Sequence, residues 1–159
     1  MEQKLSFLGL IKSKRKGACR NMKHSKDITL LLVEDDDVDA LTIERSFSKQ
    51  RIANPIVRAV DGIQALQLLN QNMVQKPYII LLDLRLPRMG GVEFLELLRK
   101  DPVHSDAVVF ILTTSEAEQD IEASYKNNVA GYFVKGKVGE QFIGVVDMLE
   151  SYWKVVQLP

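Results

Sequence analysis

The sequence is poor in the residues and segments on which several classes of protein depend. Its 159 residues include one cysteine, Cys19, so an internal disulfide framework is excluded. A single cysteine fits a reducing compartment, and we expect a cytoplasmic protein. No segment approaches the roughly 18 uninterrupted apolar residues of a membrane helix, so we expect no stable membrane insertion. The length suits one ordinary domain with a core.

Acidic and basic residues are equal in number but unevenly distributed. Residues 1–26 contain eight lysines and arginines and one acid, whereas residues 27–159 contain 13 basic and 20 acidic residues. The acidic balance of the second segment argues against nucleic-acid binding by that segment. We interpret residues 1–26 as a disordered basic arm. Contact of this arm with an anionic membrane surface, or a true start at Met22, are the alternatives.

From residue 27 onward, apolar runs of strand length alternate with segments of helical periodicity. Strands are predicted at residues 28–33, 56–60, 78–82, 108–112 and 131–134. Helices are predicted at residues 38–49, 62–71, 92–100, 116–127 and 140–156. Such βα alternation predicts an α/β domain with a parallel sheet covered by helices on both faces. The leading topology is a doubly wound five-stranded sheet in the order 2-1-3-4-5.

Polar side chains follow four of the predicted strands. Glu34 and Asp35 follow the first strand, Asp83 the third, Thr113 the fourth and Lys135 the fifth. Because the carboxyl ends of parallel strands share one edge of the sheet, we expect these side chains to converge. Taken singly, Thr113 is better explained as a hydroxyl at a strand end or helix cap, and Lys135 is better explained as a solvated strand end.

Carboxylates gathered at one edge would repel one another, and a divalent cation would remove that conflict. Magnesium prefers oxygen ligands, whereas the two histidines that zinc would favour, His24 and His104, lie outside the predicted strand ends. The further acids Asp36, Asp37 and Asp39 are surplus to a metal site. We expect them to cap the first helix and favour its dipole.

Asp83 follows four consecutive apolar residues, Ile79 to Leu82, and such a carboxylate could act as a nucleophile. Attack on a phosphoryl group would give an aspartyl phosphate. Magnesium could then meet one phosphoryl oxygen, the Lys135 ammonium a second and the Thr113 hydroxyl a third.

Residues 27–156 resemble the receiver domain of two-component response regulators, which has a flavodoxin-like fold. The segments that carry the resemblance are residues 31–36, 61–66, 82–91, 112–115 and 131–135. The resemblance implies a phosphoprotein in phosphorelay signal transduction that receives its phosphoryl group from a sensor histidine kinase, with Mg2+ as cofactor.

The resemblance also implies a role for each matching residue. Asp83 matches the phosphoacceptor and Lys135 the lysine that binds the phosphate. The expected metal ligands are Asp83, Asp35 directly, Glu34 through water, and the backbone carbonyl of Arg85. Thr113 matches the switch hydroxyl, and Tyr132 matches the aromatic residue whose rotamer follows the switch. Receivers usually carry proline after the lysine, and Gly136 stands there instead, which leaves the aim of Lys135 and the phosphate lifetime open.

The C-terminal segment narrows the resemblance. Residues 151–159 look like the ending of single-domain regulators that pair with bacterial and cyanobacterial phytochromes, so a phytochrome kinase is the expected partner. Nothing follows Pro159, so no output domain is expected. The helix at 140–156 carries two apolar stripes, which either thicken the core or form a homodimer surface. We favour a symmetric homodimer through the helix at 116–127, the strand at 131–134 and this last helix. The residues expected at its surface are Phe142, Val145, Met148, Leu149, Tyr152 and Trp153.

Two other functions fit a sheet of this kind less well. A phosphatase acting through an aspartyl phosphate usually carries a second aspartate two residues after the nucleophile, where this chain has Arg85. A flavin- or nucleotide-binding module would need glycines after the first strand, and this chain has four consecutive acids there. The sequence therefore favours a signalling switch that assists its own phosphorylation over an enzyme with a separate substrate.

Overall fold

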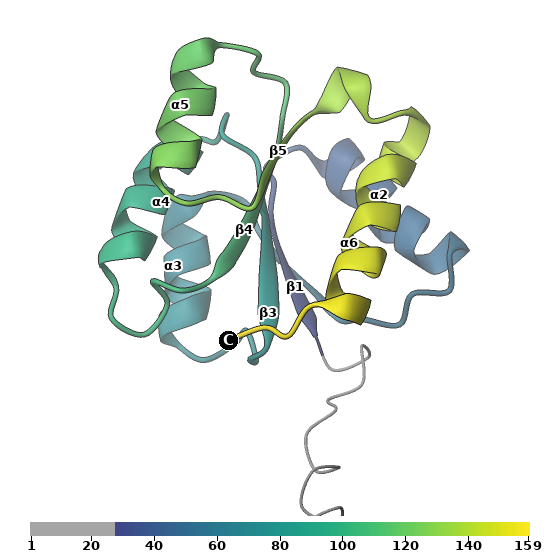
Figure 1. Ribbon diagram of the computed structural model, residues 1–159, viewed down its shortest axis with the longest axis horizontal. Coiled ribbons are helices and arrows are strands. Elements are labelled where there is room, and N and C mark those ends of the chain that lie inside the picture. The colour runs from purple at the N-terminus through teal and green to yellow at the C-terminus, as the bar shows by residue number, and fades with distance from the viewer. Residues whose placement is uncertain (1–27) are drawn as a thin grey trace, which may run out of the picture.

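A computed structural model describes residues 28–159, and the basic arm of residues 1–26 lies outside this range. The strands are β1 (Thr29–Val33), β2 (Ile56–Ala59), β3 (Tyr78–Leu82), β4 (Val108–Thr113) and β5 (Gly131–Val134). The helices are α2 (Asp37–Lys49), α3 (Gly62–Asn70), α4 (Gly91–Lys100), α5 (Glu118–Lys126) and α6 (Ile143–Val155), with two 3-10 turns, Lys135–Lys137 and Glu140–Phe142. All strands are parallel, in the order β2-β1-β3-β4-β5 (Figure 1). The predicted fold class is confirmed.

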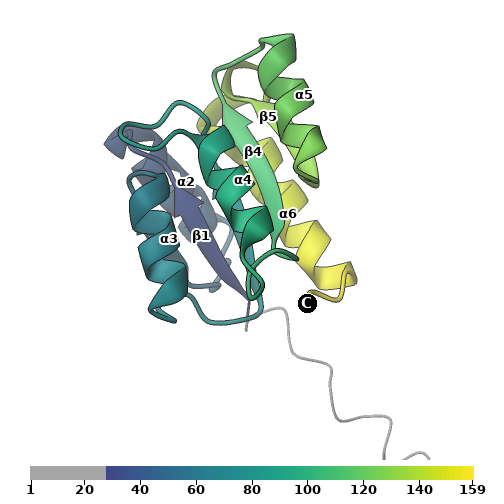
Figure 2. The same ribbon diagram turned by 90° about the vertical axis from the view of Figure 1, so that its left-hand side faces the viewer.

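Two layers of helix cover the sheet. Helices α3, α4 and α5 lie on one side, and α2 and α6 lie on the other (Figure 1); Figure 2 looks onto the first of these layers. Neighbouring strand residues point to opposite layers: Leu31 packs in the core with α3 and α4, whereas Leu30 and Leu32 pack in the core with α2 and α6. A central strand buried on both faces is apolar throughout rather than alternating, which explains the uniform apolar runs in the sequence.

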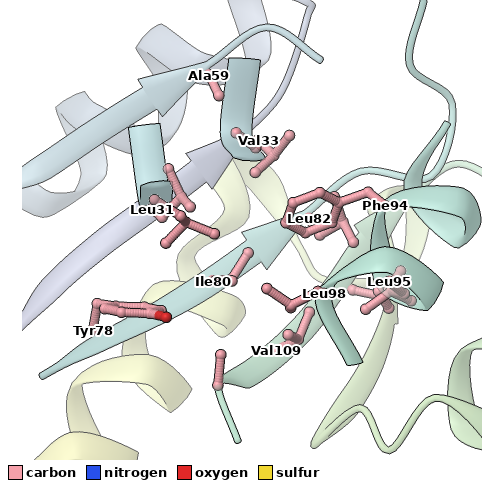
Figure 3. Packing of buried hydrophobic residues seen from close by; sticks show 14 of the residues in the cluster. Leu31, Val33, Ala59, Tyr78, Ile80, Leu82, Phe94, Leu95, Leu98 and Val109 are labelled. Carbon is pink, nitrogen blue, oxygen red and sulfur yellow. The ribbon is translucent and has the colours of Figure 1, made fainter. Parts of the chain in front are cut away.

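The core on the α3 and α4 side fixes the end of β3. Ile80 and Leu82 pack among Phe94, Leu95 and Leu98 of α4 (Figure 3), and all of these side chains are fully buried. Each such side chain stabilises the fold by about 1.5–3 kcal/mol through its removal from water. The residue that follows Leu82 is therefore held at a defined place on the carboxyl edge of the sheet.

Two aspartates begin helices beside this edge. Asp36 caps α2 by accepting hydrogen bonds from the backbone N–H groups of Val38 (2.8 Å) and Asp39 (3.0 Å). Asp61 caps α3 by accepting one from Gln64 (2.8 Å). The predicted capping of the first helix is thus confirmed for Asp36, and the cap satisfies N–H groups that would otherwise lack partners.

The prediction of one continuous helix over residues 140–156 was wrong. A 3-10 turn, Glu140–Phe142, precedes α6, and Gln141 and Phe142 both have left-handed backbone, with φ of 57° and 55°. Left-handed residues cannot continue a right-handed helix. The Ser46 hydroxyl donates to the Gln141 carbonyl (2.6 Å), and the Phe142 side chain is buried in the α2 and α6 core. Tertiary contacts therefore override the helical periodicity.

The predicted partner surface on this helix also needs correction. Four of its residues, Phe142, Val145, Leu149 and Trp153, are buried in the chain's own core. Only Met148 and Tyr152 are half-buried, and both pack against the same cluster. Helix α6 packs on the sheet and on α2, which cover most of its two apolar stripes, whereas Val155 at its end is 83% exposed. Trp153 packs on Phe47 of α2, with ring centroids 5.9 Å apart.

Within residues 28–159, no helix combines the length and the apolar character needed to cross a bilayer.

Candidate functional site

Three carboxylates meet at the carboxyl edge of the sheet. Glu34 and Asp35 follow β1 and Asp83 follows β3, and one oxygen from each lies within 4.8 Å of the others. Glu34 and Asp83 are buried and Asp35 is exposed. Because β1 and β3 are neighbours in the sheet, their ends bring these acids together as the sequence predicts. The arrangement offers hard oxygen ligands on one open side.

Lys135 follows β5 and reaches this cluster. Its Nζ lies 2.7 Å from Glu34 Oε2, 3.1 Å from Asp83 Oδ2 and 2.7 Å from Asp39 Oδ2. The Lys135 side chain is only 9% exposed, so it is a buried counter-charge rather than a solvated strand end. Asp39 was assigned only to capping and the helix dipole from the sequence. It lies in the first turn of α2, and no spacing signal singled it out.

Burial and neighbouring charges shift the pKa values of this cluster in opposite directions. Burial raises the pKa of Glu34 to about 7, with a further upward contribution from Asp83, against hydrogen bonds from Lys135 and the Asp36 backbone. Burial lowers the pKa of Lys135, but its hydrogen bonds to Asp39 and Glu34 and the charge of Asp83 outweigh this and hold it above its usual value. One ammonium does not neutralise all of these acids, so the cluster is suited to a cation.

The loop after Asp83 is held close to the cluster by its own backbone. The Arg85 N–H donates to Asp83 Oδ1 (3.1 Å), and the Gly91 N–H donates to the Leu84 carbonyl (3.1 Å). A Cβ at Gly91 would lie 2.6 Å from the Asp83 carbonyl oxygen, so the approach of α4 to this loop requires glycine. The Arg88 guanidinium binds the buried Asp61 carboxylate at the start of α3. These contacts anchor the loop at both ends.

The two residues assigned to the switch both contact Ser115, in the loop between β4 and α5. Thr113 is fully buried, and its Oγ1 accepts a long hydrogen bond from the Ser115 N–H (3.4 Å). The Tyr132 hydroxyl donates to the Ser115 carbonyl (2.9 Å). Burial raises the pKa of Tyr132, which therefore stays a hydrogen-bond donor at neutral pH. Ser115 has no role assigned from the sequence, although it lies two residues after Thr113 in one of the matching segments.

The segment with Gly136 in place of proline forms a short 3-10 turn, Lys135–Lys137, directly after β5. Within residues 28–159 the cis peptide bond is Lys76–Pro77, so the bond that joins Lys135 to Gly136 is trans. Lys135 still reaches Glu34, Asp39 and Asp83. The absence of proline therefore does not keep the ammonium from the cluster.

Comparison with known proteins finds relatives of this chain both in sequence and in fold. The family described as response regulator receiver domain matches residues 30–146. The response regulator Rcp1 of Synechocystis is 33% identical over 135 residues, which span 82% of this chain and 92% of Rcp1. The Mn2+-bound crystal structure of Rcp1 aligns with a TM-score of 0.73 and 32% identity, over 82% of this chain and 98% of Rcp1.

A second solved structure is similar over the same region. It is the phosphorylated cyanobacterial phytochrome response regulator RcpA, with a TM-score of 0.75 and 31% identity, over 84% of this chain and 99% of RcpA. The order of the strands agrees with these matches. The chain therefore belongs to the response regulator receiver family, as a homologue of Rcp1 and RcpA in phosphorelay signalling.

Proposed function

We propose that Asp83 is the phosphoacceptor of this receiver and that Mg2+ is its cofactor. The observation that carries the proposal is the Asp83 carboxylate itself, buried at the end of β3 with the Lys135 ammonium at 3.1 Å and two further carboxylates within 4.8 Å. Receivers interact with histidine kinases, so the donor is a phosphohistidine. One Asp83 oxygen attacks phosphorus, the P–N bond breaks, and the imidazole leaves with its electron pair.

Each neighbouring residue has a distinct part in this transfer. Glu34, Asp35, Asp83 and the Arg85 carbonyl would hold the cation, which supplies positive charge to the phosphoryl oxygens. Lys135 is placed to pair with a further oxygen as charge develops on it. The Thr113 hydroxyl would donate to a third oxygen, and Tyr132 would follow the movement of Thr113. The Asp39 carboxylate holds Lys135 from the side of α2 (2.7 Å).

The partners follow from the same similarities. Because RcpA is a phytochrome response regulator, we infer that a phytochrome histidine kinase donates the phosphoryl group, in the cytoplasm. The receiver acts as a switch and not as an enzyme with a separate substrate, since Arg85 stands where a phosphatase acid would be expected. A homodimer through α6 would use its exposed apolar residues Ile143 and Val155 with half-buried Met148 and Tyr152, and sedimentation of the phosphorylated protein tests it.

Incubation with magnesium and acetyl phosphate, followed by intact mass spectrometry, tests the proposal. We expect one phosphoryl adduct on the wild type and none on Asp83→Asn. Asp37→Asn is the matched control, because Asp37 lies near the same edge of the sheet, is 89% exposed and pairs with Arg58 rather than Lys135. An adduct that persists in Asp83→Asn would reject the assignment. Release of many equivalents of phosphate from an ester substrate would favour a phosphatase instead.

A further inference from the structure

The loop that joins β1 to α2 carries two of the proposed cation ligands, and an arginine from β2 holds its backbone. Arg58 Nε donates to the Glu34 carbonyl (3.0 Å), and Arg58 Nη2 donates to the Asp35 carbonyl (3.2 Å). Arg58 lies opposite Leu32 in the register of β1 and β2, two residues before Glu34. Its side chain therefore reaches along the sheet to the carboxyl edge, where the acids of the candidate site lie.

The two ligands in this loop differ in what fixes their side chains. The Glu34 carboxylate is buried and accepts hydrogen bonds from the Lys135 ammonium (2.7 Å) and the Asp36 N–H (3.1 Å). The Asp35 carboxylate is exposed, and in the described part of the chain it has neither a hydrogen bond nor an ion pair. Its place within 4.8 Å of the other acids therefore depends on the backbone that carries it. The Arg58 bond to the Asp35 carbonyl fixes that backbone.

Arginine suits this position because of the shape of its head group. A guanidinium is planar and offers several N–H donors in a fixed fork, so one side chain can bind two successive carbonyls. Both carbonyls accept from a charged donor, which strengthens a hydrogen bond. Arg58 also pairs with Asp37 (2.8 Å), but the Asp37 side chain is 89% exposed, and an exposed ion pair contributes little. The hold on the loop therefore belongs to the carbonyl bonds rather than to the ion pair.

We propose that Arg58 is a positioning residue of the cation site: it holds the backbone of Glu34 and Asp35 so that both carboxylates lie within reach of Asp83 before a cation binds. The inference deepens the proposed function, on which it rests, because it concerns the residues that would hold Mg2+. A ligand set that is already ordered loses less conformational freedom when the cation binds. The charge of Arg58 acts in the opposite sense, since a guanidinium beside the site repels a cation.

Replacement of Arg58 by lysine separates this geometry from the charge. Arg58→Lys keeps a positive charge, but its single ammonium does not reproduce the fork. The loss of one of the two carbonyl bonds frees part of the backbone that the cation must then order, so the Mg2+ dissociation constant should rise about 3- to 10-fold. The Asp36 N–H, which donates to Glu34 Oε1 (3.1 Å), should also exchange faster in the metal-free protein.

Isothermal titration calorimetry with magnesium chloride and amide hydrogen exchange by NMR, both on the full chain, test the proposal. Arg99→Lys is the matched control, because Arg99 also donates to backbone carbonyls, but at the opposite end of the sheet. It should lower stability and leave the Mg2+ dissociation constant within about 2-fold of the wild type. Asp37→Asn removes the ion pair but keeps both carbonyl bonds, and it should also stay within about 2-fold. Urea denaturation without metal checks that each variant is folded.

The effect of Arg58→Lys on phosphorylation should depend on the magnesium concentration. Because Arg58 acts through the cation ligands rather than on the phosphoryl group, the adduct with acetyl phosphate should form slowly at low magnesium and at the wild-type rate at saturating magnesium. A rate that stays low at saturating magnesium overturns the proposal, because Arg58 would then act on the transfer itself.

The outcomes of the titration separate the role of Arg58 from the function on which it rests. A dissociation constant that rises in Arg58→Lys alone, with faster exchange at Asp36, supports the proposal. An equal or lower constant in Arg58→Lys, with magnesium bound by the wild type, overturns the positioning role and leaves the proposed function intact. Rises of the same size in Arg99→Lys or Asp37→Asn also overturn it, because stability or the ion pair would then set the affinity. A wild type that binds no magnesium overturns the proposed cofactor and the positioning role together.

Discussion

The two ends of the sheet both bury polar side chains, but they do so in opposite ways. At the carboxyl end, Glu34, Asp39 and Asp83 share the ammonium of Lys135. At the amino end of β3, the Tyr78 hydroxyl forms a hydrogen bond with His104 Nδ1 at 2.7 Å, and both residues are buried. The first set brings like charges together, whereas the second is a matched donor and acceptor. A conflict of charge that the chain alone does not resolve marks the end where a ligand acts.

At the amino end of the sheet, the buried polar groups have hydrogen-bond partners. Arg99 of α4 donates to four backbone carbonyls in the loops around β4, at 2.7–3.1 Å. Burial raises the pKa of Tyr78 to about 12, so the phenol stays neutral. Burial also lowers the pKa of Arg99. These buried groups are paired as donors and acceptors, so we expect this end to contribute stability without taking part in phosphorylation.

Among the substitutions that test this difference between the two ends of the sheet, removal of the Lys135 side chain should have the largest effect on stability and phosphorylation. Lys135→Met leaves Glu34 and Asp83 buried without a counter-charge, and breaking a buried ion pair from one side costs about 3–5 kcal/mol. We expect a loss of about 3 kcal/mol in the free energy of unfolding at pH 7 without metal, partly restored by magnesium, and a strong loss of phosphoryl incorporation. Urea denaturation and intact mass measure these effects.

Lys137, two residues after Lys135, supplies the control for Lys135→Met. Lys137 lies in the same 3-10 turn and pairs with Glu116, but both side chains are more than half exposed, at 66% and 59%. Lys137→Met should therefore change the free energy of unfolding by less than about 0.5 kcal/mol. Similar losses in Lys135→Met and Lys137→Met would show that the carboxyl end holds no buried charge conflict.

Removal of Arg99 should have a smaller effect on stability and none on phosphorylation. Arg99→Met leaves several backbone carbonyls around β4 with weaker partners, and we expect a loss of about 2–3 kcal/mol in the free energy of unfolding. Lys100→Met, one residue further along α4 and exposed, is the control. Below the unfolding transition, the yield of phosphoryl adduct should match the wild type. A folded Arg99→Met protein that is not phosphorylated would remove the contrast between the two ends.

Much of the site could be predicted because it depends on strand ends. A parallel sheet places the residues after β1, β3 and β5 on one edge, so Glu34, Asp83 and Lys135 follow from the order of the strands alone. Asp39 could not be placed in the same way, because its contact with Lys135 depends on how α2 turns relative to the sheet. Its charge also has an adequate local explanation at the start of a helix.

The hydrogen bonds of Ser115 with Arg85 and Asp120, and the start of α6, could not be predicted, for related reasons. Arg85, Ser115 and Asp120 come from two loops and a helix whose spacing in the sequence carries no periodic signal. Helical spacing predicts a partner surface on α6 because it shows how wide an apolar face is, but not how many neighbours cover it. Left-handed backbone at Gln141 and Phe142 leaves no signal in residues that are neither glycine nor asparagine.

The smallest expected effects lie in the turn that follows Lys135, where two glycines differ in backbone conformation. A Cβ at Gly136 would meet no atom within 4 Å, whereas Gly139 has left-handed backbone with φ of 82°. Gly136→Ala should stabilise the protein by about 0.5 kcal/mol, because alanine has fewer unfolded conformations, and Gly139→Ala should destabilise it by about 1 kcal/mol. Urea midpoints measure both changes.

A longer-lived aspartyl phosphate in Gly136→Ala would show that turn flexibility limits the hold of Lys135 on the phosphate. An unchanged lifetime with the expected stability gain would show that the contacts of Lys135 with Glu34 and Asp39 already fix its aim. Shifts of both midpoints in the same direction would contradict the assigned backbone conformations.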